Sequence, residues 1–207
     1  MMPSLRYAFA VFINVLLPAA AYRLALGHYG IEGALVASMI PLLLWLVIDL
    51  ARFRHVDALS AVVLAGLVMS WSLLVLKPAQ WLVDVREPLV SGVIGALFLL
   101  SLMWRRPVVF YLARSTLSRE RQGREREFDA MWTSRPALVR SIRLMTLVWG
   151  IGLVAENIVR LGVLDHMHGD DAERASTLVR YGFYGALTAW TIFYRRAYIR
   201  KQAGPGQ

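Results

Sequence analysis

The stretch ALSAVVLAGLVMSWSLLVL, residues 58–76, contains nineteen consecutive residues without a charged side chain. A helix that crosses the roughly 30 Å hydrocarbon core of a bilayer needs about 20 mostly apolar residues, so this stretch predicts a transmembrane helix. It lacks the strict alternation of apolar and polar residues that is typical of membrane barrel strands. The stretch therefore indicates a helical membrane protein.

Five further stretches have the same apolar character, although the last two include ionisable residues. The six predicted spans cover residues 7–26, 33–51, 58–76, 88–104, 144–164 and 175–194. The whole chain is 57% hydrophobic and 18% charged, whereas an average soluble domain has about 45–50% apolar and about 25% charged residues. We therefore expect an all-α fold, a polytopic membrane helical bundle of six transmembrane helices in a single domain.

Basic residues gather on one side of this predicted topology. Seventeen of the 23 Lys and Arg residues fall in segments that lie inside if the N-terminus is cytoplasmic, and ten of these are arginines of segment 105–143. The opposite connections are acidic: Glu32, Asp84, Glu87, Asp165, Asp170, Asp171 and Glu173. The positive-inside rule then places both termini in the cytoplasm. The net charge of +9 is mainly a topology signal.

The first span has a second interpretation. Arg6, the apolar run and the small residues Ala19, Ala20 and Ala21 resemble a signal peptide with its cleavage site. The run is at the long end for such a signal, so we expect the helix to be retained. Cleavage would leave five helices in the same orientation.

Segment 105–143 is the one sizeable part outside the predicted spans, and we call it the Arg-rich loop. Apolar side chains recur in it at helical spacing before Pro136: Val109, Ala113, Leu117, Phe128, Met131 and Trp132. This pattern predicts an amphipathic segment between the fourth and fifth spans that lies on anionic phospholipid headgroups. The alternative is a polar loop whose arginines only enforce topology. Nucleic-acid binding is not expected, because interleaved glutamates weaken the positive field.

Ionisable residues within the last two spans form the main candidate site. Glu156 and Arg160 are four residues apart, so they share a helix face, and Asn157 lies beside them. Arg180 lies at a similar depth in the sixth span, and Arg23 ends the first span on the same side. Three arginines around one glutamate would keep a positive charge, as in a site for a small anion or a phosphate headgroup. The alternative is a structural ion pair that locks the last two helices.

Other polar residues give weaker signals. Asn14, Pro18 and Tyr22 form a stripe on the first helix, and Pro18 should kink that helix. Small residues in the fourth span suit close helix contact: Ser91, Gly92, Gly95 and Ala96. A weak metal candidate consists of His166, His168 and Asp170, but the spacing matches no common metal site and we favour a hydrated loop.

Catalytic signatures are absent from the sequence. It contains no GxSxG, HExxH, P-loop or GxGxxG motif. It also contains no cysteine, which excludes disulfides, thiolate zinc sites and cysteine nucleophiles. We therefore expect no enzymatic activity and no cofactor. Residues 202–207 are predicted to be a flexible tail.

Several segments carry a resemblance to a known family. RRPVVFYLAR (105–114), EFDAMW (127–132) and LMTLVWGIGLVAENIVR (144–160) resemble the second half of an uncharacterised family of bacterial multi-pass inner-membrane proteins. NVLLPAAAYRLA (14–25) and RFRHVDAL (52–59) resemble its first half. More distantly, the chain is similar to the intracellular septation protein A family. That likeness implies a location in the bacterial inner membrane and a role in cell-envelope maintenance, although the Arg-rich loop and the sixth helix depart from that family.

Three function classes follow from these observations. An envelope-organising or interaction protein, with envelope proteins or a second copy as partners, is favoured by the resemblance and by the amphipathic segment. A transporter, channel or lipid-binding protein for a small anion or phospholipid headgroup is favoured by the embedded Glu/Arg group. A membrane enzyme is least favoured. A polar pocket that reaches the Glu/Arg group would favour the second class over the first.

Overall fold

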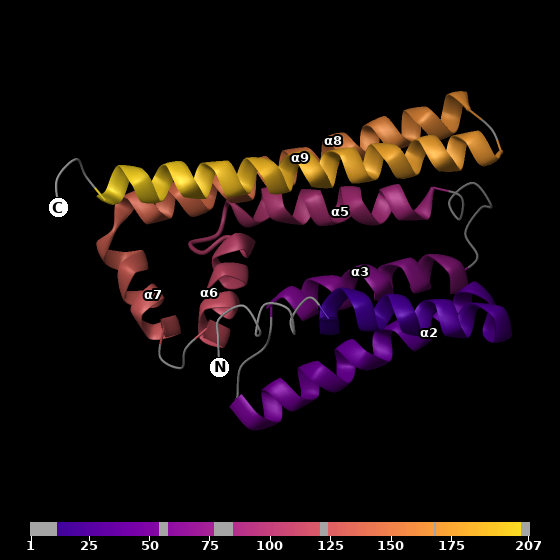
Figure 1. The fold of residues 1–207 in the computed structure, drawn as a ribbon, viewed down its shortest axis with the longest axis horizontal. Helices are drawn as coiled ribbons and strands as arrows, with labels where there is room; N and C mark the ends of the chain where they lie inside the picture. The colour runs from indigo at the N-terminus through magenta and orange to yellow at the C-terminus, as the bar shows by residue number, and fades with distance from the viewer. Residues whose placement is uncertain (1–11, 54–57, 77–84, 121–123, 168, 204–207) are drawn as a thin grey trace.

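The fold is described from a computed structural model. The structure describes residues 12–53, 58–76, 85–120, 124–167 and 169–203, and within them the chain is all-α without strands. It contains a π-helical turn, η1 (Phe12–Leu16), and seven α-helices. The helices are α2 (Leu17–Phe53), α3 (Ala58–Val75), α5 (Arg86–Ser101), α6 (Val108–Glu120), α7 (Arg124–Ser134), α8 (Pro136–His166) and α9 (Asp170–Ala203) (Figure 1).

Helix α2 contains residues 17–26 of the first predicted span and the whole of the second. It bends at Gly30, whose φ of 64° and ψ of −170° are not helical, and its two arms diverge from this point (Figure 1). Glycine takes a positive φ without the steric cost that a Cβ would add. The predicted separation of residues 7–26 from 33–51 is therefore achieved by a single bend rather than a loop, while residues 7–11 lie outside the described part.

Two described helices are long and apolar enough to cross a membrane, Leu17–Ile48 of α2 (counted across its bend) and α8. The expected helical structure is therefore confirmed, whereas the expected number of six membrane spans is not. Helix α5 has 16 residues, below the roughly 17–25 that span a bilayer. Helix α9 has its charged residues within 170–180 and 195–201, and it is not apolar enough to be counted as a span. The predicted tail is partly wrong, because α9 continues to Ala203, and residues 204–207 lie outside the described part.

The polar stripe of the first helix is only partly visible. Pro18 is buried and Tyr22 is half-buried, whereas the side chain of Asn14 is outside the described part. The π-helical turn η1 ends directly before Leu17. Such a turn widens the backbone, which accommodates a proline that cannot donate a hydrogen bond to the preceding turn. Pro18 thus coincides with a change of helix type, whereas the bend of α2 lies at Gly30, so the expected kink at Pro18 is not confirmed.

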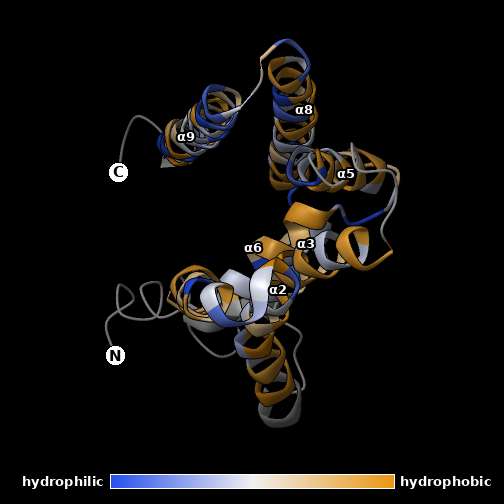
Figure 2. Cartoon of the chain, turned by 90° about the vertical axis from the view of Figure 1, so that its right-hand side faces the viewer, coloured by the Kyte–Doolittle hydropathy of each residue, from blue (hydrophilic) through white to orange (hydrophobic). Residues whose placement is uncertain are grey.

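The helices form an open arc rather than the expected bundle. Among the described residues, the backbone of α9 lies against α8, that of α8 against α5, that of α5 against α3 and that of α3 against α2, and α9 does not lie against α2 (Figure 2). The accessible surface is 13512 Å² for a mass of 23.3 kDa, whereas a compact monomer of this size would expose about 9,700 Å². Helical segments can be recognised in sequence, but the order in which they pack cannot, and the expected six-span bundle is not confirmed.

The closest helix contact is between α5 and α8. A Cβ on Gly95 would lie 2.8 Å from Cβ of Leu153 and 2.9 Å from the backbone nitrogen of Val154. Ser91, Gly92 and Gly95 are buried as predicted, whereas Ala96 is exposed. Small residues allow this approach, and van der Waals contact over the interface fixes the register of α8 on α5.

The Arg-rich loop is an ordered helical hairpin. In Figure 1, α6 and α7 run across the direction of α5, α8 and α9 at one end of the molecule. Phe110 is fully buried and packs on Phe128 and Trp132, with ring centroids 5.2 and 4.6 Å away. The predicted apolar face is confirmed, since Val109 is buried and Ala113, Leu117 and Met131 pack against the same cluster. The segment is therefore helical and not an irregular loop, and the alternative that its arginines only enforce topology stays a prediction.

Polar contacts close this end as well. Asp129 accepts a hydrogen bond from Nε of Arg114 at 3.1 Å and lies 3.6 Å from Arg106.

Helix α8 begins at Pro136, so residues 136–143 are helical and belong to α8 instead of the predicted loop. Apolar composition marks the part of a helix that avoids water, not the point where the helix starts, which explains this difference.

Candidate functional site

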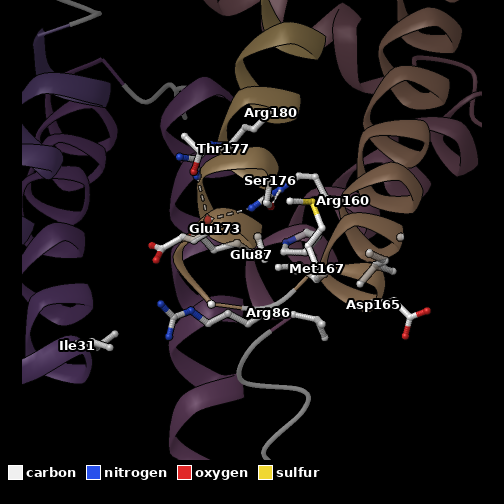
Figure 3. A pocket seen from close by; sticks show the side chains of 17 residues that line it. Ile31, Arg86, Glu87, Arg160, Asp165, Met167, Glu173, Ser176, Thr177 and Arg180 are labelled. Carbon is white, nitrogen blue, oxygen red and sulfur yellow. Dashed lines mark hydrogen bonds and ion pairs between the residues drawn. The ribbon is translucent and has the colours of Figure 1, made fainter.

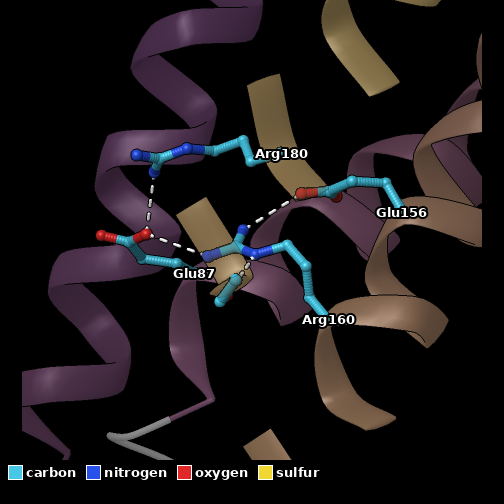
Figure 4. A network of polar contacts seen from close by, with 5 residues as sticks. Glu87, Glu156, Arg160 and Arg180 are labelled. Atoms are coloured by element: carbon cyan, nitrogen blue, oxygen red, sulfur yellow. Dashed lines mark hydrogen bonds and ion pairs between the residues drawn. The ribbon is translucent and has the colours of Figure 1, made fainter. Parts of the chain in front are cut away.

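Arg160 joins three helices at the end of the molecule opposite α6 and α7. Its side chain is 5% exposed. Nε donates to the hydroxyl of Ser176 on α9 at 2.8 Å, and one terminal nitrogen donates to Oε1 of Glu156 on α8 at 3.1 Å. The other terminal nitrogen donates to Oε2 of Glu87 on α5 at 3.2 Å (Figure 4). The predicted contact between Glu156 and Arg160 is confirmed, and every nitrogen of this guanidinium is engaged.

Glu87 connects Arg160 to Arg180. Its Oε2 also accepts a hydrogen bond from Arg180 at 2.9 Å (Figure 4). The carboxylate of Glu87 is 53% exposed and the side chain of Arg180 is 29% exposed. The predicted neighbour of Arg180, Glu156, is not its hydrogen-bond partner. The network therefore runs Arg180, Glu87, Arg160, Glu156, with its more exposed members, Glu87 and Arg180, at one end and the buried Arg160 and Glu156 at the other.

The expected excess of positive charge within this network is wrong. Arg23 is exposed and makes no hydrogen bond or ion pair with the residues that the structure describes. Two arginines, Arg160 and Arg180, face two carboxylates, Glu87 and Glu156, so the formal charges balance. Burial explains the balance, because an unpaired charge in a protein interior is costly.

Behind the network, the interface between α5 and α8 holds further polar atoms. The amide of Asn157 packs against Gly92, where an added Cβ would lie 2.5 Å from its nitrogen. Oε2 of Glu156, Oδ1 of Asn157 and Oγ of Ser91 are buried and have no hydrogen-bond partner in the described structure. Asn157 therefore adjoins the network through the backbone of α8 and packs on α5, without a direct bond to the arginines.

A pocket of about 1080 Å³ opens beside the network. The ends of α5, α8 and α9 line it, and Ile31 approaches from the bend of α2 (Figure 3). Its charged lining residues are Arg86, Glu87, Arg160, Asp165, Glu173 and Arg180. Glu156 does not line the pocket and is fully buried. The pocket thus reaches two arginines of the network but stops before its innermost carboxylate.

The weak metal candidate gains no support. His166 is exposed and its Nδ1 lies 2.9 Å from the carbonyl of Gly162, at the end of α8. Asp170 is exposed, and His168 lies outside the described residues. Within the described part of the chain, no group of three His, Asp or Glu side chains is arranged to hold a metal ion.

Sequence reasoning missed Glu87, the residue that bridges the two arginines. It was interpreted as one of several acidic residues in outer connections. Its position directly before Pro88, at the start of an apolar run, could have shown that it lies at the level where Arg160 and Arg180 enter their spans. Arg86 was missed for the same reason.

Comparisons with known proteins give no relative: no protein-family model, curated protein or solved structure matches the chain. The resemblance to bacterial inner-membrane proteins stays a prediction. The functional argument consequently depends on the geometry of the chain itself.

Proposed function

We propose that this chain is a multi-pass protein of the bacterial inner membrane, with six helical passes and both termini in the cytoplasm. Large apolar side chains support this proposal because many are exposed along the long helices: Leu24 (77%), Val47 (63%), Ile158 (62%), Leu178 (72%) and Phe193 (68%). Exposed apolar surface of this extent requires a covering, and lipid is the covering that fits helices of this length.

The distribution of charge supports the proposed orientation. Arg106, Arg114 and Arg143 lie at the end that carries α6 and α7, whereas Glu87, Asp165 and Glu173 lie at the opposite end. The positive-inside rule assigns the first end to the cytoplasm. Helices α6 and α7, which run across the long helices, would then lie along the inner headgroup layer. The pocket would open at the outer surface.

We further propose that the pocket binds a phosphate-bearing group, either a phospholipid headgroup or a small anion. The observation that carries this proposal is the half-exposed Glu87 carboxylate on Arg180 at the wall of the pocket. A phosphate oxygen that displaces this carboxylate would receive the same charge-assisted hydrogen bond. Arg180 is 29% exposed and its described hydrogen bond goes to Glu87, so an incoming phosphate can compete with that carboxylate for the guanidinium.

Binding to the purified chain in detergent tests this proposal. The probes are glycerol phosphate and phosphoethanolamine, measured by calorimetry. Arg180→Gln should weaken the binding of both by about tenfold or more, because a hydrogen bond to a charged group is lost. Arg174→Gln is the matched control, since Arg174 is exposed on the same helix and does not line the pocket. Equal binding by both variants, or no saturable binding, would overturn the proposal.

The second candidate is an envelope-organising interaction protein. The open arc favours it, because within the described structure the backbone of α9 packs on α8 and its one described contact with α5 is the side-chain bond of Arg180 to Glu87, which leaves much of α9 available to a partner. A cell growth assay separates the candidates. If the folded Arg180→Gln variant fully replaces the native chain in cells, the pocket is dispensable and the interaction role is favoured.

A further inference from the structure

Acidic and basic groups alternate on one side of the pocket. In Figure 3 the charged ends of Arg86, Glu173 and Arg180 point to the same side, toward the helix that carries Ile31, and Asp165 points away. Three arginines and three carboxylates line the pocket altogether. The lining therefore carries no net formal charge, although it contains groups that attract either sign.

The arginines of the pocket differ in how far they are engaged. Arg160 donates from all three nitrogens to protein partners. Arg180 makes one hydrogen bond, to Glu87, and is 29% exposed. Nε of Arg86 is buried without a hydrogen-bond partner among the described residues. Arg180 and Arg86 are therefore the groups with donors to spare for an anionic ligand.

Glu173 supplies the opposite charge on the same face of α9. Residues 173, 177 and 180 are four and three positions apart, so Glu173, Thr177 and Arg180 line one side of the helix. Glu173 is exposed and forms no ion pair with any residue that the structure describes. The Cα atoms of Glu173 and Arg180 are about 10 Å apart along the helix axis. Thr177, which carries a hydroxyl group, lies between these two residues on the same side of the helix.

We infer that the ligand of this pocket is a zwitterion that carries a phosphate and an ammonium group, such as a phosphoethanolamine headgroup or its free form. This inference rests on the proposed function. The phosphate binds Arg180 and Thr177, and the ammonium group binds Glu173. A purely anionic ligand would meet the same arginines, but Glu173 and Glu87 would repel it. Because the lining has no net positive charge, its arginines do not outweigh this repulsion. The volume of about 1080 Å³ is ample for such a headgroup.

Selectivity between two phosphate compounds tests the inference. The native chain should bind phosphoethanolamine about tenfold or more tightly than glycerol phosphate, because only the first can pair with Glu173. Glu173→Gln should abolish that preference and strengthen the binding of glycerol phosphate. Asp171→Asn is the matched control: it removes the same charge from an exposed position of α9 outside the pocket and should leave the preference unchanged.

The outcomes separate this inference from the proposed function. Equal affinity of the native chain for both compounds, or an unchanged preference in Glu173→Gln, would overturn the zwitterion and leave the phosphate site in place. Failure of both compounds to bind would overturn the proposed function itself. The source of the ligand is found by native mass spectrometry with phosphatidylethanolamine and free phosphoethanolamine in competition. If the lipid stays bound, the ligand is the headgroup of a membrane lipid. If free phosphoethanolamine displaces the lipid, the ligand is the soluble compound.

Discussion

The two ends of the molecule use arginines and carboxylates in different ways. At the end of α6 and α7, Asp129 contacts Arg114 and Arg106 next to a dry aromatic cluster around Phe110. At the other end, Glu87 contacts Arg160 and Arg180 at the wall of an open pocket. The difference is in the covering: aromatic rings fill the first end, whereas the helix ends diverge at the second. The ion pairs of the first end adjoin a buried core, whereas Glu87 and Arg180 stay partly exposed beside the pocket.

The largest effect is expected from Arg160, which belongs to the pocket end but is buried. Arg160→Met leaves the fully buried Glu156 without its partner. Breaking one side of a buried pair costs about 3–5 kcal/mol, so the thermal unfolding temperature in detergent should fall strongly. Replacing both residues with apolar ones, Glu156→Leu together with Arg160→Met, should recover most of this loss.

Arg174→Met provides the reference for that experiment, since Arg174 is exposed on α9. If Arg160→Met loses no more stability than this control, the joining of three helices by Arg160 is not structural. If the double variant is stable and still binds phosphate compounds, Arg160 acts only on the fold and the site is limited to the outer arginines.

A smaller loss is expected at the filled end from Phe110→Ala. Phe110 is 0% exposed, and removal of a buried phenyl ring costs about 3 kcal/mol, at the lower end of the range because α6 lies at the edge of the structure. Tyr111→Ala is the neighbouring control, since Tyr111 is 47% exposed. The affinity for phosphate compounds should not change. Loss of that affinity would show that the two ends are coupled, contrary to the comparison.

The smallest effect on stability is expected from Glu87→Gln. The carboxylate is half-exposed, and pairs of this kind contribute about 0–1 kcal/mol. Binding of glycerol phosphate should become tighter, because a competing negative charge is removed from Arg180. Glu32→Gln, at an exposed position outside the pocket, should change neither property. Weaker binding in Glu87→Gln would show that this carboxylate supports the ligand instead of competing with it.

Parts of the fold and site could be predicted because they depend on neighbours in the sequence. The pair of Glu156 and Arg160 follows from four-residue spacing on one helix. The buried face of Val109, Ala113 and Leu117 follows from the same periodicity. Each prediction concerns residues whose relative positions are fixed by one helix, whatever the rest of the chain does.

The sequence by itself determined that the chain is all-helical and that Glu156 pairs with Arg160. Only the tertiary structure decided that Glu87 completes the network, since it lies 73 residues from Arg160 and 93 from Arg180. The tertiary structure also places Arg23 outside the network, and it arranges the helices as an open arc. The physical reason is that contacts between helices depend on their rotation and register, which are set by close packing such as that of Gly95 on Leu153.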